Sequence, residues 1–107
     1  MAQFSITNPV KCTIYALYTQ LGAYRYVGQT IKLPEERLNG HRSAGCAYGN
    51  VFERWLHMNR DLLKIKILEE CDTNTSDDRE RHWMYHLRMR GHDLLNIRPG
   101  GRWGIDG

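Results

Sequence analysis

The period of hydrophobic and polar positions changes along the chain, and these changes mark the expected elements. Residues 12–18 and 23–28 are rich in aromatic and β-branched side chains, a composition typical of strands. The connection at residues 19–22 is short and contains a glycine, which favours a β-hairpin. Residues 64–68 alternate polar and apolar side chains, so they predict a third strand with one solvated face.

Three helices are expected after the hairpin. Pro34 and the two glutamates after it begin a helix that should extend to about Ser43, because proline suits the first helical position and acids suit the positive end. Residues 50–59 carry an apolar stripe at helical spacing, formed by Val51, Phe52, Trp55 and Leu56. Residues 75–77 offer several N-caps for a third helix, which Gly91 should end.

The element order ββααβα predicts the α+β class, with a three-stranded antiparallel sheet flanked by about three helices. A chain of 107 residues predicts one domain, here over residues 1–101, with residues 102–107 as a flexible Gly-rich tail or linker. The longest apolar run, residues 14–18, is far below the ~20 residues of a membrane span. Residues 1–11 lack the apolar core of a secretory signal, so we expect an intracellular location, in the cytoplasm or nucleoid.

The predicted hairpin makes a sharper geometric prediction. A four-residue loop would pair residues whose numbers sum to 41, so Tyr15 would face Tyr26 directly. Both rings would then lie on one side of the ribbon. A slip of one residue would destroy this arrangement.

The charge is unevenly distributed along the sequence. The net charge is only +3, but residues 67–78 contain five acidic side chains and no Lys or Arg. Eleven of the fifteen basic residues are arginines, which pair bidentately with phosphate and stay charged. This bias favours a polyanionic partner slightly over a merely solvated basic face.

The cysteines argue against two common uses of this residue. There are three, with no C-x-x-C motif, which speaks against a disulfide framework and a zinc ribbon. Cys71, His82 and His86 come nearest to a zinc site. Zincins have Glu directly after the first histidine, where this chain has Trp83, so we interpret these histidines as surface residues.

Four polar side chains in the first half of the chain are candidates for catalysis. Tyr15 and Tyr26 share one face of the predicted hairpin, and Arg37 and His41 are four residues apart on one face of the first predicted helix. Each has a structural alternative: paired tyrosines commonly pack, and the helical pair could be a solvated face.

Two further candidates lie near the third predicted helix. Glu80 precedes the apolar positions Trp83, Met84 and Leu87 of that helix. A carboxylate on such a face costs free energy unless it is paired, protonated or metal-bound. The alternative is that Asp77 and Glu80 form a capping box. Asn96 follows the helix and could equally be a turn residue.

Taken together, these residues resemble the GIY-YIG nuclease family, in particular its small phage and homing-type members. The matching segments, in order, are residues 13–15, 26–30, 37–41, 79–83 and 95–97. The resemblance extends from residue 12 to about residue 101. The first triplet reads Thr-Ile-Tyr, so Thr13 replaces the first glycine of the motif.

The resemblance implies a metal-dependent endonuclease that hydrolyses phosphodiester bonds in DNA, expected to be double-stranded. In the implied roles, Tyr15 and Tyr26 orient and deprotonate a water molecule, and His41 assists proton movement. Arg37 stabilises the transition state. An unperturbed tyrosine has a pKa near ~10, so acting as a base would need a nearby cation to lower it.

The same resemblance implies that Glu80 binds one divalent cation, Mg²⁺ or Mn²⁺. A hard carboxylate ligand together with water ligands suits Mg²⁺. Asn96 would hold the phosphate or the local backbone. The alternative function is a non-cleaving module on the same fold that binds nucleic acid or protein, although every expected side-chain type is present. A further alternative is that the chain is the catalytic part of a longer nuclease.

Overall fold

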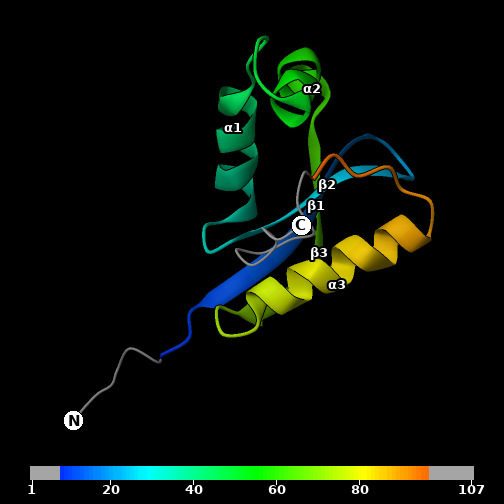
Figure 1. The fold of residues 1–107 in the computed structure, drawn as a ribbon. Coiled ribbons are helices and arrows are strands. Elements are labelled where there is room, and N and C mark those ends of the chain that lie inside the picture. The colour runs from blue at the N-terminus through cyan, green and yellow to red at the C-terminus, as the bar shows by residue number, and fades with distance from the viewer. Residues whose placement is uncertain (1–7, 97–107) are drawn as a thin grey trace.

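The computed structural model describes residues 8–96, and its elements have the predicted ββααβα order (Figure 1). They are β1 (Lys11–Gln20), β2 (Ala23–Thr30), α1 (Pro34–Ala44), α2 (Val51–Asn59), a 3₁₀ turn η2 (Arg60–Leu62), β3 (Lys64–Asp72) and α3 (Ser76–Met89). The predicted α+β class is confirmed. The tail predicted at residues 102–107 lies outside the described residues. Within the described part, no helix has the length and apolar character needed to cross a membrane.

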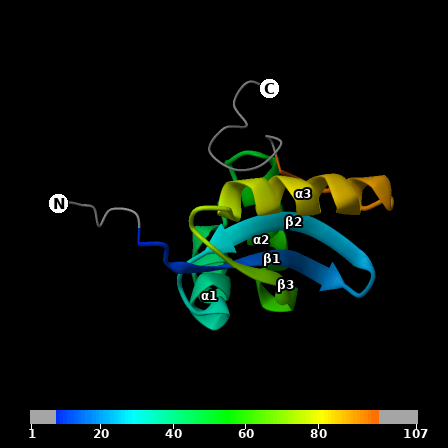
Figure 2. The same cartoon turned by 90° about the horizontal axis from the view of Figure 1, so that it is seen from below.

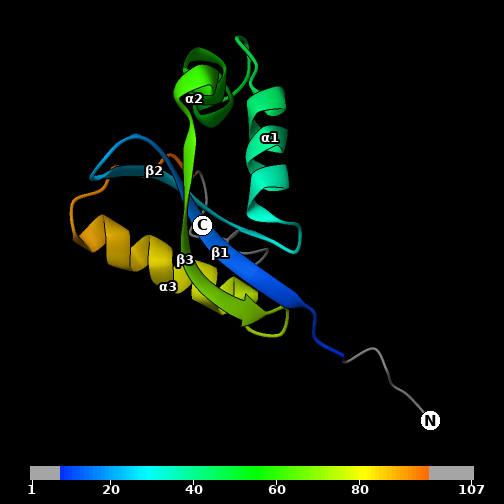
Figure 3. The same ribbon diagram turned by 180° about the vertical axis from the view of Figure 1, so that it is seen from behind.

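The sheet separates two helical layers. Its strand order is β2-β1-β3, and both pairings are antiparallel. Figures 1 and 3 show α1 and α2 on one side of the sheet and α3 on the other. Figure 2 shows α3 running alongside β2, which is one edge of the sheet. Side chains of β1 therefore enter a hydrophobic layer on both faces.

The alternation of β1 decides which core each residue joins. Ile14 packs with Val27 and with Met84 of α3. Tyr15 and Leu17 point the other way and pack with α2 and the segment before β3. A strand buried on both faces is a continuous apolar run, as residues 14–18 are.

The predicted hairpin register is wrong by two residues. Tyr15 pairs with Gly28 and Leu17 pairs with Tyr26, because the turn contains only two residues instead of four. Gly22 makes this short turn possible, since its φ of 84° is a left-handed conformation that glycine adopts without strain. A shift of two keeps every side chain on its face. Tyr15 and Tyr26 therefore share one face as predicted, but as diagonal neighbours.

The capping box occurs at α2 and not at α3. Asn50 accepts a hydrogen bond from the Glu53 backbone N–H, and Glu53 accepts one from the Asn50 backbone N–H, both at 2.8 Å. Helix α3 begins at Ser76, so Glu80 lies beyond its first turn and the capping role considered for it is wrong. The box fixes the start of α2, which carries Phe52 towards the sheet.

Candidate active site

The hydroxyl group of Tyr15 is the centre of the site. Tyr15 is 0% exposed, and its Oη lies 2.6 Å from His41 Nε2. Arg37 donates a hydrogen bond from Nε to the same oxygen at 3.1 Å. The spacing of four residues on α1 brings Arg37 and His41 to one face of the helix. Three of the predicted site residues therefore converge on a single atom.

Tyr26 completes this cluster from β2. Its ring meets the ring of His41 edge-on, with centroids 5.7 Å apart. On another side it stacks on Phe52, with centroids 4.0 Å apart and planes inclined by 11°. Phe52 also contacts His41 edge-on at 5.7 Å. Sequence reasoning placed Phe52 only in an apolar stripe, because its contact with the tyrosine depends on how α2 packs on the sheet.

Gly28 is required by the close approach of the Tyr15 ring. A Cβ atom at this position would lie 2.5 Å from Tyr15 Oη and 2.6 Å from its Cζ, well inside van der Waals contact. The backbone at Gly28 has an ordinary strand conformation, so the reason for glycine is space and not a positive φ. The second motif, Tyr26 to Thr30, therefore supplies one tyrosine of the site and, at Gly28, the space that the Tyr15 ring occupies.

Burial keeps both tyrosines protonated. Burial raises the pKa of Tyr15 far above its usual range, and the nearby Tyr26 adds to the effect. The pKa of Tyr26 is also raised, first by burial and then by the charge of Glu80. Arg37 lowers the pKa of each tyrosine but does not outweigh burial. It is the nearby cation that base catalysis by tyrosine would need.

His41 is the natural acceptor for the Tyr15 proton. Burial, reinforced by the charge of Arg37, lowers the pKa of His41 to about 4, so the imidazole is neutral at pH 7. Arg37 can only donate to Tyr15 Oη. The hydroxyl proton is then best directed at Nε2 of His41, which leaves the imidazole proton on Nδ1. This arrangement gives a short path for a proton from tyrosine to histidine.

Glu80 reaches the site around the edge of the sheet. It is 8% exposed and lies on the buried face of α3 with Met84 and Leu87, as its sequence position predicted. Its Oε1 accepts a hydrogen bond of 2.6 Å from Nε2 of Gln29. Helix α3 packs on the opposite face from Tyr15, yet the charge of Glu80 raises the pKa values of both tyrosines. Since β2 is an edge strand, no further strand separates the two faces of the sheet beyond it.

Asn96 binds the exposed backbone of this same edge. Its Oδ1 accepts a hydrogen bond of 3.0 Å from the Val27 N–H, and its Nδ2 donates one of 2.8 Å to the Val27 carbonyl. The amide therefore pairs with β2 as another strand would, next to Gly28. It holds the backbone, whereas a contact with phosphate remains a prediction.

The oxygen donors at this edge fit a magnesium ion better than a zinc ion. Within residues 8–96 no group of three or more His, Cys, Asp or Glu side chains could hold a metal. Glu80 and Asp77 both bind the Gln29 amide, so two carboxylates lie near one point. Mg²⁺ commonly uses one or two protein carboxylates and keeps several waters, while structural zinc takes four protein ligands.

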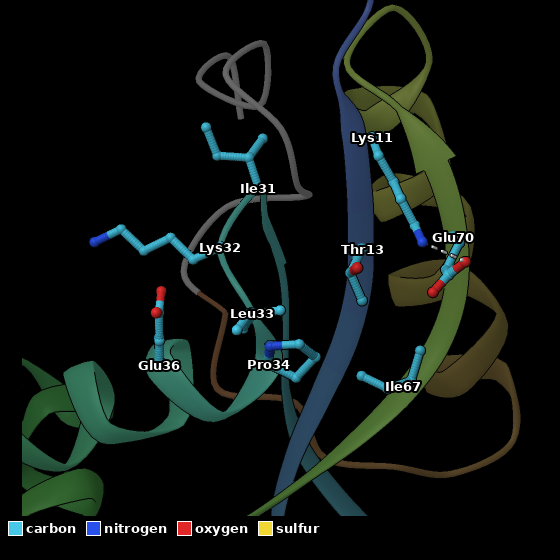
Figure 4. Close-up of a pocket in the computed structure, with 9 residues that line it drawn as sticks. All are labelled: Lys11, Thr13, Ile31, Lys32, Leu33, Pro34, Glu36, Ile67 and Glu70. Atoms are coloured by element: carbon cyan, nitrogen blue, oxygen red, sulfur yellow. Dashed lines mark ion pairs between the residues drawn. The ribbon is translucent and has the colours of Figure 1, made fainter.

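A pocket of about 530 Å³, drawn in Figure 4, is lined by none of the six candidate site residues. It lies between the start of α1 and strands β1 and β3 and is lined by Lys11, Thr13, Ile31, Lys32, Leu33, Pro34, Glu36, Ile67 and Glu70. Lys11 pairs with Glu70 at 3.2 Å. The lining contains two basic and two acidic side chains, so its charge does not favour a polyanion.

Comparison with known families agrees with this geometry. The GIY-YIG catalytic domain matches residues 11–93, which is most of the chain. The chain belongs to the GIY-YIG family. Members of this family are endonucleases that act on DNA. Searches of curated proteins and of solved structures gave no significant match.

The GIY-YIG match contains five of the six predicted site residues, and Asn96 lies just beyond it. Thr13, where the family motif has its first glycine, is buried and pairs with Thr30 in a regular part of β1. The residue that sequence reasoning missed is Gln29. Strand alternation alone puts it on the face opposite Tyr26, but its bond to Glu80 required the position of α3.

Replacing Gly28 with alanine should displace the Tyr15 hydroxyl. We expect Gly28→Ala to lower the free energy of unfolding by about 1–3 kcal/mol, the usual cost of overpacking. It should also slow DNA cleavage at a temperature where the variant is still folded. Thermal unfolding and a cleavage assay test this. Gly40→Ala is the matched control, since a Cβ at Gly40 has no neighbour within 4 Å. Wild-type behaviour of Gly28→Ala would contradict the role given to the close approach.

The lowered pKa of His41 should make stability depend on pH. Its usual value of 6.5 applies to the unfolded chain, which therefore binds more protons than the folded protein between pH 6.5 and about 4. Stability should fall as the pH falls through this window, by about 2 kcal/mol at pH 4.5. His41→Gln cannot titrate, so its denaturation free energies should fall less steeply. Parallel curves for the two proteins would refute the assignment.

Proposed function

We propose that this domain is a magnesium-dependent endonuclease that hydrolyses phosphodiester bonds in double-stranded DNA. The observation that carries the proposal is the convergence of Arg37 and His41 on the Tyr15 hydroxyl, beside Tyr26. This cluster combines a proton path with a fixed positive charge, and hydrolysis of a phosphodiester needs both.

The tyrosines and His41 would activate the attacking water. Tyr26 is the more accessible of the two, since Tyr15 is fully buried, so Tyr26 would orient the water. As the Tyr15 proton moves to His41 Nε2 over 2.6 Å, the tyrosine hydroxyls would take up the proton that the water releases. A neutral imidazole supports this role, because an imidazolium ion could not accept the proton.

Arg37 would stabilise the charge that develops on the phosphoryl oxygens. Its Nε is already bound to Tyr15, which fixes the plane of the guanidinium group. Within residues 8–96 no hydrogen bond involves its two terminal amino groups. They can therefore donate to the scissile phosphate in the paired geometry that arginine favours. The half-exposed position of Arg37 suits a group that must meet the substrate.

Glu80 would hold one magnesium ion at the β2 edge. A bound divalent cation supplies neutralising charge to the phosphoryl oxygens and assists the leaving oxygen. Glu80 suits this role because it is a buried carboxylate close enough to raise the pKa values of both tyrosines. The excess of arginine in the chain supports binding to the DNA backbone.

Replacing Glu80 with glutamine tests the proposed metal ligand. The variant keeps the shape and loses the charge, so it should fold, bind duplex DNA at least as well as the wild type, and lose Mg²⁺-dependent cleavage. Plasmid nicking with and without Mg²⁺, together with a binding assay in EDTA, measures both effects. Glu70→Gln is the control, because Glu70 is exposed on β3. Cleavage by Glu80→Gln at the wild-type rate would place the metal elsewhere. A wild type that binds DNA without cutting it would favour the non-cleaving module.

Replacing Arg37 with alanine should affect the rate more than the affinity for DNA. Loss of one donor that stabilises a transition state typically costs ~10²–10³ in rate. We therefore expect nearly normal duplex binding and much slower cleavage under single-turnover conditions. Arg54→Ala removes the same charge from an exposed position on α2 and should cleave nearly as fast as the wild type. If the two variants have equal rates, Arg37 is an ordinary surface arginine.

A further inference from the structure

The side-chain amide of Gln29 joins two carboxylates of α3 to the edge of the sheet. Its Nε2 donates to Glu80 Oε1 at 2.6 Å and to Asp77 Oδ1 at 2.7 Å. Both hydrogens of the amide group are used, one for each carboxylate. Gln29 lies on β2 one residue beyond Gly28, and its side chain points to the α3 face while the Tyr15 ring covers Gly28 on the other.

The orientation of this amide is determined on both sides. Its Oε1 faces the buried thiol of Cys12, which donates to it at 3.8 Å. A reversed amide would direct its carbonyl oxygen at two carboxylates and would place its amino group near a thiol. Repulsion excludes that arrangement. The donor therefore faces the carboxylates.

The shared amide also reduces the electrostatic repulsion between the two carboxylates. Two carboxylates that approach the same nitrogen repel each other, and the repulsion grows as solvent is excluded. Glu80 is the more buried of the two, at 8% exposed. A donor held between them offsets part of this repulsion and limits the rotation of both side chains. Among Gln29, Asp77 and Glu80, only Gln29 belongs to the sheet, so it sets where the carboxylates lie relative to the tyrosines.

We propose that Gln29 is a positioning residue, which holds the carboxylate of Glu80 in place for the metal by donating to Glu80 and Asp77 together. The inference rests on the proposed magnesium-dependent cleavage. It adds that the affinity of the site for the metal depends on a neutral amide on β2. Residues that orient metal ligands in this way typically contribute 10–100-fold to metal affinity or activity.

The first test measures how cleavage depends on magnesium concentration. Gln29→Leu removes the donor and keeps most of the side-chain volume. With DNA saturating, the Mg²⁺ concentration that gives half the maximal rate should rise about 10–100-fold, and the rate should partly recover at high Mg²⁺. Gln20→Leu, the same substitution at the exposed end of β1, should leave both values unchanged. Gln29→Met keeps the length of the side chain without the donor or a new charge and serves as a second variant if Gln29→Leu folds poorly.

This measurement separates positioning from a purely structural link between β2 and α3. A structural defect reduces the amount of active protein but does not change the half-saturating Mg²⁺ concentration. An unchanged half-saturation value with a lower melting temperature would overturn the proposal. A lower half-saturation value would overturn it too, because the amide would then compete with the cation.

The second test needs no cleavage and no DNA. Mn²⁺ broadens NMR signals of nearby protons, so the backbone amide signal of Gly28 should disappear as Mn²⁺ is added to the wild type. Gln29→Leu should need at least about tenfold more Mn²⁺ for the same broadening, and Glu80→Gln should show none. Equal titrations of wild type and Gln29→Leu would overturn the proposal. If the wild type does not cleave DNA, the proposed function fails, and this titration still decides the role of Gln29.

Discussion

The close contact between the Tyr15 ring and Gly28 is the constraint on which the site depends. Because β2 has no side chain at this position, the Tyr15 hydroxyl can lie against the neighbouring strand and still reach Arg37 and His41 of α1. A displacement of this ring would break both hydrogen bonds together. One missing Cβ atom thus links the geometry of the hairpin to that of the first helix.

The second organising feature is that β2 is an edge strand. Asn96 pairs with its outer backbone at Val27, and the next polar side chain along the strand, Gln29, reaches the carboxylates of α3. An edge strand leaves backbone groups unpaired, and here a side-chain amide satisfies them. The same edge lets Glu80 act on tyrosines that belong to the opposite face of the sheet.

Burial then sets the protonation states that the proposed chemistry uses. It raises the pKa values of both tyrosines and lowers that of His41, so all three side chains are neutral at pH 7 and Arg37 supplies the positive charge. The buried carboxylate of Glu80 supplies the opposite charge at the sheet edge. A neutral proton path between two charges of opposite sign is an arrangement suited to a polyanionic substrate and a cation, and only a packed interior maintains it.

The sequence by itself determined the order of the elements, the shared face of Tyr15 and Tyr26 and, by resemblance to the GIY-YIG motifs, the six candidate residues. The first two follow from periods of two and 3.6 residues, which are local properties. Tertiary structure decided the hairpin register, the contact of Phe52 with Tyr26, and the binding of Asp77 and Glu80 by Gln29. The register depended on the length of the turn, which has two residues where the sequence pattern predicted a loop of four. The other contacts join residues that are separated by 26 to 51 positions in the sequence. They form only when helices pack on the sheet, so no local pattern encodes them.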